Sequence, residues 1–156
     1  MSIKENIDCD ESIIHYRQKA EQGDADAQCN LGICYYEGNG VEQDSYKALN
    51  WFIKSAEQDD PRGQLYLGYC YADDDLAIFD YNEALKWLHK SAEQGNAEAQ
   101  FVLGLWYAEG TGKVITQNLN EAAKWFRKSA EQGNTDAEHY LDYVEKWINA
   151  DIRNLK

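Results

Sequence analysis

The residues of this chain that could do chemistry do not stand at the spacings that such chemistry needs. No cysteine pair has the Cys-x-x-Cys spacing, and no histidine lies at metal-ligand spacing from a cysteine. The four cysteines, which we expect to be reduced and to act as small apolar side chains, are Cys9, Cys29, Cys34 and Cys70. The three histidines are isolated from one another: His15, His89 and His139.

A run of three aspartates, Asp73–Asp75, invites a calcium interpretation. An EF-hand loop needs alternating ligands, a central glycine and a terminal glutamate, and these are missing here, so a solvated acidic turn is predicted. The chain also holds no phosphate-binding loop, no HExxH string and no nucleophile elbow. We therefore expect no catalytic residues, no metal site and no cofactor in a protein that is not an enzyme.

The composition indicates one folded domain with a strong negative charge. The 156 residues include 15 Lys and Arg against 28 Asp and Glu, which gives a net charge of −13. A chain this acidic, with no basic stripe, is repelled by phosphate backbones, so nucleic acid is not an expected partner. It has no run of about 18 apolar residues and opens on a polar stretch, so we expect no membrane span, no secretory signal and a cytoplasmic location.

The chain repeats itself with a period of about 36 residues. The string from Lys19 to Gly23 returns in similar form at Ser55, Ser91 and Ser129, in steps of 36, 36 and 38 residues. An independent marker shows the same period: Trp51, Trp87 and Trp125. Self-similarity at this period is the signature of a repeat architecture.

Each repeat has the apolar pattern of two helices. In the first helix of repeat one, Ala27, Leu31, Cys34 and Tyr35 fall on one face of a 3.6-residue spiral. A second helix carries the tryptophan, and a residue suited to its N-cap precedes it in each repeat: Asp44, Asp80 and Asn118.

A glycine follows the leucine of every first helix, at Gly32, Gly68 and Gly104. Glycine inside a helix costs about 1 kcal/mol relative to alanine, so its recurrence needs a reason. We interpret it as the close approach of two backbones.

A helix pair of this kind cannot bury its apolar face alone, so neighbouring pairs must stack. We predict a single all-α domain over residues 1–156, an α-solenoid of antiparallel helix pairs with repeats of about 36–38 residues. Its predicted parts are an N-terminal capping helix at 11–22, repeats at 25–58, 61–94 and 97–132, and a C-terminal capping helix at 135–153.

One combined motif covers most of the first repeat. It reads Ala27-Gln-Cys-Asn-Leu-Gly-Ile-Cys-Tyr-Tyr-Glu-Gly-Asn-Gly-Val-Glu-Gln-Asp44, followed by Ala48-Leu-Asn-Trp51 and Ser55-Ala-Glu-Gln58. This motif resembles the Sel-one-like (suppressor-of-lin-like) repeat, a branch of the tetratricopeptide-repeat superfamily, and the resemblance extends over about residues 13–147. It implies a right-handed superhelix whose first helices line a concave face. It also implies an adaptor that holds other proteins together, while some bacterial members are immunity proteins.

The second repeat departs from this motif in the loop between its helices. The loop reads Asp73-Asp-Asp-Leu-Ala-Ile-Phe79 and contains no glycine. Its large apolar side chains form a candidate binding site, the alternative being that they fold back onto the helix pair: Leu76, Ile78 and Phe79.

The positions that vary between repeats indicate a binding groove. If the first helices turn these positions to the concave face, as the resemblance implies, they form an aromatic and aliphatic floor rimmed by acids, which is typical of protein-binding surfaces. The alternative is that some of these side chains pack between repeats. The predicted groove residues are Tyr36, Glu37, Arg62, Leu65, Tyr69, Asp73, Phe101, Leu105 and Glu109.

Two functions fit these features, and we favour the first. It is a non-enzymatic adaptor that binds another protein, with a basic or amphipathic surface, through the concave groove. The net charge would then steer a positively charged partner towards it. The alternative is a bacterial immunity protein that neutralises a cognate toxin or effector by stoichiometric binding, because small size and acidity suit both roles.

Overall fold

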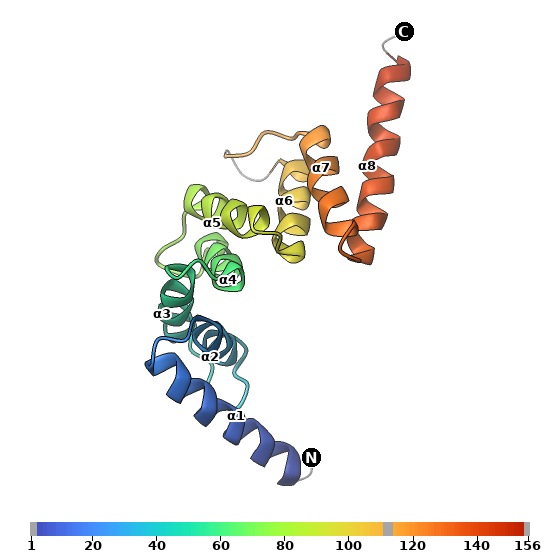
Figure 1. Cartoon of the computed structure of the whole chain (residues 1–156). Helices are drawn as coiled ribbons and strands as arrows, with labels where there is room; N and C mark the ends of the chain where they lie inside the picture. The colour runs from blue at the N-terminus through green and yellow to red at the C-terminus, as the bar shows by residue number, and fades with distance from the viewer. Residues whose placement is uncertain (1–2, 111–113, 155–156) are drawn as a thin grey trace. The chain divides into compact units, whose positions relative to one another are not determined.

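Eight α-helices and no strand make up the part of the chain that this computed structural model describes, residues 3–110 and 114–154 (Figure 1). Side chains are described for residues 12–110 and 114–150, so that of Cys9 lies outside this part. None of the described helices is long and apolar enough to cross a bilayer. The helices are α1 (Ile3–Glu21), α2 (Ala25–Glu37), α3 (Ser45–Ala56), α4 (Pro61–Ala72), α5 (Tyr81–Glu93), α6 (Ala97–Glu109), α7 (Leu119–Ala130) and α8 (Thr135–Asn154).

The predicted all-α fold of helix pairs is confirmed. The pairs α2–α3, α4–α5 and α6–α7 occupy the three predicted repeats, with α1 and α8 at the two ends. The first helix begins at Ile3 rather than at residue 11, because residues 3–10 are mostly polar and two isoleucines are too few to predict a helix.

Short polar side chains start the helices, including all three predicted N-caps. The Asp44 carboxylate accepts a hydrogen bond from the backbone N–H of Lys47 at 2.9 Å, and the Asn118 side chain accepts one from that of Glu121 at 3.1 Å. Asp80 caps α5 in the same way. The cap satisfies a backbone donor that has no partner inside the helix, which fixes where each second helix begins.

The chain divides into two compact units, Met1–Phe79 and Asp80–Lys156. The first holds α1 to α4 and the second holds α5 to α8, so the boundary lies in the second repeat, at the end of the loop that lacks glycine. Within each unit, every helix packs against the next one along the chain, and α2 also contacts α4.

Two of the recurrent glycines lie beneath phenylalanine rings. A Cβ atom on Gly32 would stand 2.5 Å from Cε1 of Phe52, and one on Gly104 would stand 2.5 Å from Cδ1 of Phe126. Both rings are fully buried and have no room to swing away. The close approach is therefore between a helix backbone and an aromatic ring, and the interpretation as two backbones is wrong at these positions.

Serines on the second helices hold the start of the first helix in the same repeat. The buried Ser55 hydroxyl donates to the carbonyl of Ala25 at 2.9 Å, and Ser129 makes the equivalent bond in the second unit. Two backbones do approach closely beside this serine, since a Cβ on Gly63 would lie 2.8 Å from the amide nitrogen of Ala56. A larger residue at Gly63 would separate α4 from the end of α3.

A buried glutamine joins α2 and α6 to the helical segments on either side of each. Gln100 Nε2 donates to the carbonyl of Ala92 at 3.0 Å, while its Oε1 accepts from Gln132 at 2.8 Å. Gln28 makes the same pair of bonds in the first unit. Because a buried amide without partners costs about 1–3 kcal/mol, this complete set of bonds favours one packing register.

The last helix departs from the first-helix pattern at several positions, two of which correspond to glycines in α6 or directly after it. Asp142 occupies the repeat position that corresponds to Gly104 in α6, and its carboxylate pairs with Lys146 at 2.5 Å. Ile148 stands in the register of Gly110, whose left-handed backbone (φ 74°) ends α6. Without a glycine there to end it, α8 continues for 20 residues.

Candidate functional site

The predicted groove residues divide between the two units, and first helices carry them in both. Those of the first unit, on α2 and α4 or directly after α4, are Tyr36, Glu37, Arg62, Leu65, Tyr69 and Asp73. Those of the second unit, on α6, are Phe101, Leu105 and Glu109.

In the first unit, two of the predicted residues belong to one cluster of aromatic rings. Tyr66 stacks on Phe52 with the ring centroids 4.9 Å apart and the planes 12° apart. Tyr36 and Tyr69 meet Tyr66 edge-on at 6.4 and 5.9 Å. Phe52 is buried while the three tyrosines are half-buried, so the cluster presents tyrosine rings at the surface.

Arg62 bridges α4 and α2. Its guanidinium donates to Asp26 Oδ1 at 2.8 Å and to Asn30 Oδ1 at 2.6 Å. Leu65 is 2% exposed and packs within the unit, which is the alternative that the sequence left open for some groove positions.

Burial and negative charge act together on the half-buried Tyr36. Burial raises the pKa of its phenol, and Cys70, Asp73 and Glu37 nearby raise this pKa further. The hydroxyl therefore remains protonated and can donate a hydrogen bond. The surface formed by Tyr36, Glu37 and Asp73 suits a partner that places a hydrogen-bond acceptor at the phenol and a positively charged group beside it.

The glycine-free loop turns one of its apolar side chains inward. The turn is held by the carboxylate of Asp73, which accepts from the N–H of Asp75 at 3.0 Å, and by its carbonyl, which accepts from Leu76 at 3.2 Å. Leu76 is 5% exposed, Ile78 is half-buried and Phe79 is 43% exposed. Phe79 is therefore the loop candidate with the most surface to offer a partner.

The three carboxylates of the aspartate run lie within 4.8 Å of one another, on Asp73, Asp74 and Asp75. Two of them are exposed, and exposed acidic groups of this kind are common without a metal. In the described residues, no histidine, cysteine or further carboxylate joins these three aspartates within 4.8 Å.

In the second unit, Phe101 belongs to a cluster that matches the one in the first. Its ring centroid lies 5.8 Å from that of Phe126 and 5.6 Å from that of Tyr140. Tyr140 stacks on Phe126 at 5.5 Å, as Tyr66 stacks on Phe52. Leu105, also on α6, is half-buried and packs against the same core, and Glu109 is exposed at the end of the helix.

Helix α8 adds exposed aromatic side chains that the predicted groove set does not contain. We name Tyr140, Tyr143 and Trp147, which are 44%, 59% and 50% exposed, the α8 aromatic surface. Acidic Glu138 and Asp142 lie beside Tyr143. Tyr143 occupies the repeat position that holds Tyr69 and Leu105 in earlier repeats, so the repeat spacing identifies it in the sequence. Trp147 occupies a position that holds acidic residues in earlier repeats, so the spacing does not reveal it.

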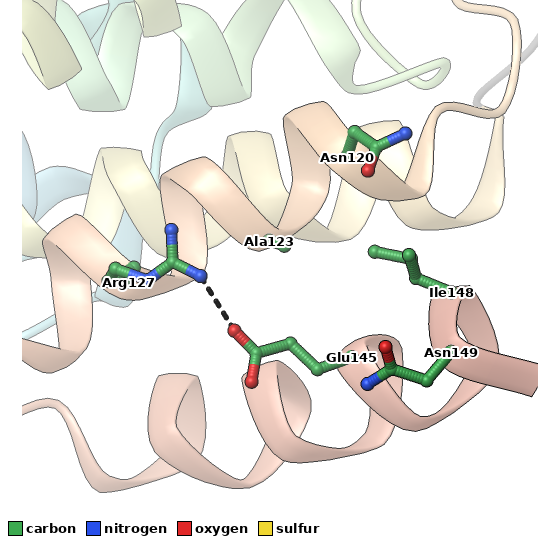
Figure 2. A pocket seen from close by; sticks show the side chains of 6 residues that line it. All are labelled: Asn120, Ala123, Arg127, Glu145, Ile148 and Asn149. Carbon is green, nitrogen blue, oxygen red and sulfur yellow. Dashed lines mark hydrogen bonds and ion pairs between the residues drawn. The ribbon is translucent and has the colours of Figure 1, made fainter. Parts of the chain in front are cut away.

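A separate cleft of about 300 Å³ lies between α7 and α8 (Figure 2). Arg127 on α7 and Glu145 on α8 point towards each other and form an ion pair, with Nη2 and Oε1 2.6 Å apart. We name this the α7–α8 cleft, which is lined by Asn120, Ala123, Arg127, Glu145, Ile148 and Asn149. Nothing in the sequence analysis pointed to it, because it depends on which faces of two helices meet.

His89 is held in the packing of the second unit. Its Nε2 lies 3.2 Å from the hydroxyl of Tyr107, and its ring lies 5.5 Å from that of Trp125. Burial lowers its pKa, against the opposing effects of Glu93 and Glu121. His89 is a boundary residue with defined partners, while His15 and His139 are exposed.

These features define a class: a repeat protein of stacked antiparallel helix pairs that presents aromatic and acidic side chains at its surface. The Sel1 repeat model matches residues 25–60, 61–96 and 97–134, so the chain belongs to the Sel1 repeat family. The resemblance predicted from the first repeat is confirmed. A comparison with curated proteins finds no match.

Two solved structures resemble the chain closely. One is c5321, a protective antigen present in uropathogenic Escherichia coli strains that displays an SLR fold. It is 36% identical to this chain, the match covers 87% of this chain and 29% of the c5321 chain, and the TM-score is 0.81. The other is a Sel1 repeat protein from Oxalobacter formigenes, 33% identical over 85% of this chain and 53% of its own, with a TM-score of 0.75. The chain therefore spans about a third to a half of these relatives.

Proposed function

We propose that this chain is a non-enzymatic adaptor that binds a partner protein through the aromatic and acidic surface of its first helices. Sel1 repeats are associated with protein–protein interaction, which supports the general class. The observation that carries the proposal is that both units combine exposed or half-buried aromatic rings with carboxylates on first helices. Tyr36 and Tyr69 lie with Glu37 and Asp73 in the first unit.

The partner we propose has a basic or amphipathic surface. Arginine and lysine side chains can lie over tyrosine and tryptophan rings while carboxylates accept their hydrogen bonds. The net charge of −13 would raise the association rate with such a partner and make that rate sensitive to salt. We place the adaptor in the cytoplasm, a reducing setting that suits Cys29, Cys34 and Cys70, which are not in disulfide bonds.

The test is quantitative affinity capture from the native cytosol with three forms of the chain. They are the wild type, the double variant Tyr69→Ala/Tyr143→Ala, and a control, Tyr46→Ala, which removes an equally exposed tyrosine (56%) from second helix α3. We expect one stoichiometric partner that the double variant loses at least tenfold and the control retains. Loss in the control with retention in the double variant would contradict the proposal, because it would place binding on the second helices.

The identity of a captured partner also separates the two roles that the sequence suggests. A toxin or effector whose activity the chain blocks at a one-to-one ratio would define an immunity protein. A partner that remains active while held together with other proteins would define an adaptor.

A further inference from the structure

The same junction occurs three times between a second helix and the first helix that follows it. In each case a polar side chain on the second helix meets a side chain eighteen residues further on. Arg17 Nη2 lies 3.3 Å from the hydroxyl of Tyr35, and His89 Nε2 lies 3.2 Å from that of Tyr107. The third pair is Arg127 with Glu145, 2.6 Å apart.

At the first two junctions, a tryptophan of the next second helix packs near one member of the pair. Trp51 of α3 packs with Tyr35 against the buried Ala27 and Leu31. Trp125 of α7 lies 5.5 Å from the ring of His89. The ammonium group three residues after each tryptophan lies over its ring, at 4.2 Å for Lys54 on Trp51 and 4.4 Å for Lys128 on Trp125.

At the third junction, this position is the α7–α8 cleft. Figure 2 shows Arg127 and Glu145 at one end of it, with Ala123 on α7 and Ile148 on α8 between the two helices. Helix α8 continues past the position that corresponds to Gly110 instead of turning, and no other described helix of the second unit lines this cleft. The repeat pattern therefore indicates which element would fit this cleft: a helix with an aromatic side chain at the position that corresponds to Trp51 and Trp125.

We propose that the α7–α8 cleft is a second docking site, which binds an amphipathic helix of a partner protein through an indole placed over the Arg127–Glu145 pair. Guanidinium groups stack favourably on indole rings. Ala123 and Ile148 provide apolar contact, and the amides of Asn120 and Asn149 can bond to the polar edge of the docked helix. None of the six residues that line this cleft belongs to the aromatic surfaces in the proposed function, although Asp142, which the docked helix would also meet, lies beside Tyr143.

Asp142 adds a requirement at the next residue of the docked helix. In α3 and α7 the residue after the tryptophan is a phenylalanine, Phe52 or Phe126, whose ring covers a glycine. In α8 that glycine register holds Asp142, which is exposed and charged. A phenylalanine there would meet a carboxylate, so the helix that fits carries lysine or arginine directly after its aromatic residue.

The probe for this site is a synthetic peptide of residues 80–94 carrying Leu88→Lys, with blocked ends. It keeps Trp87 in second-helix register and places a lysine directly after it. Since Leu88 is fully buried in the folded chain, the lysine also prevents the peptide from replacing α5 itself. Binding is measured by calorimetric titration into the whole chain and mapped by amide chemical shifts.

We expect saturable binding with shifts centred on residues 120–127 and 145–149. The Kd should rise at least tenfold with a peptide that also carries Trp87→Ala, and at least tenfold with the chain variant Arg127→Ala. The matched control is Arg17→Ala, the same change at a junction where Trp51 already packs; it should leave the Kd unchanged.

Four outcomes would overturn this proposal. The first is no binding, and the second is binding that Arg127→Ala does not weaken. The third is self-association of the chain in sedimentation that Arg127→Ala abolishes, which would make the occupant a second copy of this chain. Loss of peptide binding in Tyr69→Ala/Tyr143→Ala but not in Arg127→Ala also contradicts it, because that result moves the peptide to the aromatic surfaces of the proposed function.

Discussion

Burial lowers the pKa of His89, and this has a consequence for stability against pH. The unfolded chain binds a proton at this histidine near the ordinary pKa of about 6.5, whereas the folded chain binds it at lower pH. Below about pH 6.5 the unfolded state therefore holds more protons, and the free energy of unfolding falls as pH decreases until the folded pKa is passed. We expect a drop in melting temperature between pH 7.5 and pH 5.5.

The contribution of His89 is isolated by comparing two histidine variants over that range. His89→Gln removes the titrating group but keeps a polar side chain near Tyr107, so it should show a smaller drop than the wild type. His139→Gln changes an exposed histidine on α8 and should retain the full drop. Equal pH dependence in all three proteins would contradict the role given to burial at His89.

The packing of α6 against α7 depends on the glycine beneath Phe126. Gly104→Ala gains about 1 kcal/mol of helix propensity, but its Cβ would stand 2.5 Å from a fully buried ring. Overpacking of this kind costs about 1–3 kcal/mol, so we expect a net loss of stability of about 1 kcal/mol by chemical denaturation. The double-mutant cycle with Phe126→Leu should show that this loss shrinks or reverses. Additive effects would mean that the ring does not set the requirement for glycine.

The elements of this fold were largely predictable because their signals are local and repeated. Asp44 and Asn118 mark helix starts by hydrogen bonds to residues three positions on, and the 36-residue period counts the helix pairs. What the glycines face was not predictable, since the partner of Gly104 lies 22 residues away on another helix. The start of α1 is not predicted for the opposite reason: a segment with few apolar residues gives too weak a periodicity to detect.

The candidate site was predictable in part for the same physical reason. Repeat register predicts Tyr36 and Tyr69 on first helices, and in the structure both meet Tyr66 in one aromatic cluster. Register does not distinguish a position covered by a neighbouring helix from an exposed one, so Leu65 was assigned to the groove although it is buried. The α7–α8 cleft depends on which faces of α7 and α8 meet, which no residue pattern shows directly.

At the scale of the whole molecule, some acidic residues lie where they lower the free energy of unfolding. Glu57, Glu93 and Glu131 recur at the ends of second helices, where the negative end of the helix dipole disfavours a carboxylate by about 0.3–1 kcal/mol at low salt. They also add to the self-repulsion of a chain with a net charge of −13. Residues that reduce stability in every repeat are expected to serve another purpose, and attraction of a basic partner is the one proposed above.

The triple variant Glu57→Gln/Glu93→Gln/Glu131→Gln tests whether these glutamates lower the stability of the chain while attracting a basic partner. It reduces the net charge from −13 to −10, so its melting temperature in 10 mM NaCl should exceed that of the wild type, and the difference should shrink in 300 mM NaCl because salt screens both effects. The association rate with a captured basic partner should fall at low salt and converge with the wild-type rate at high salt. If the variant were more stable but bound its partner equally fast at low salt, these glutamates would not attract the partner, and steering would have to come from the acids beside the aromatic surfaces.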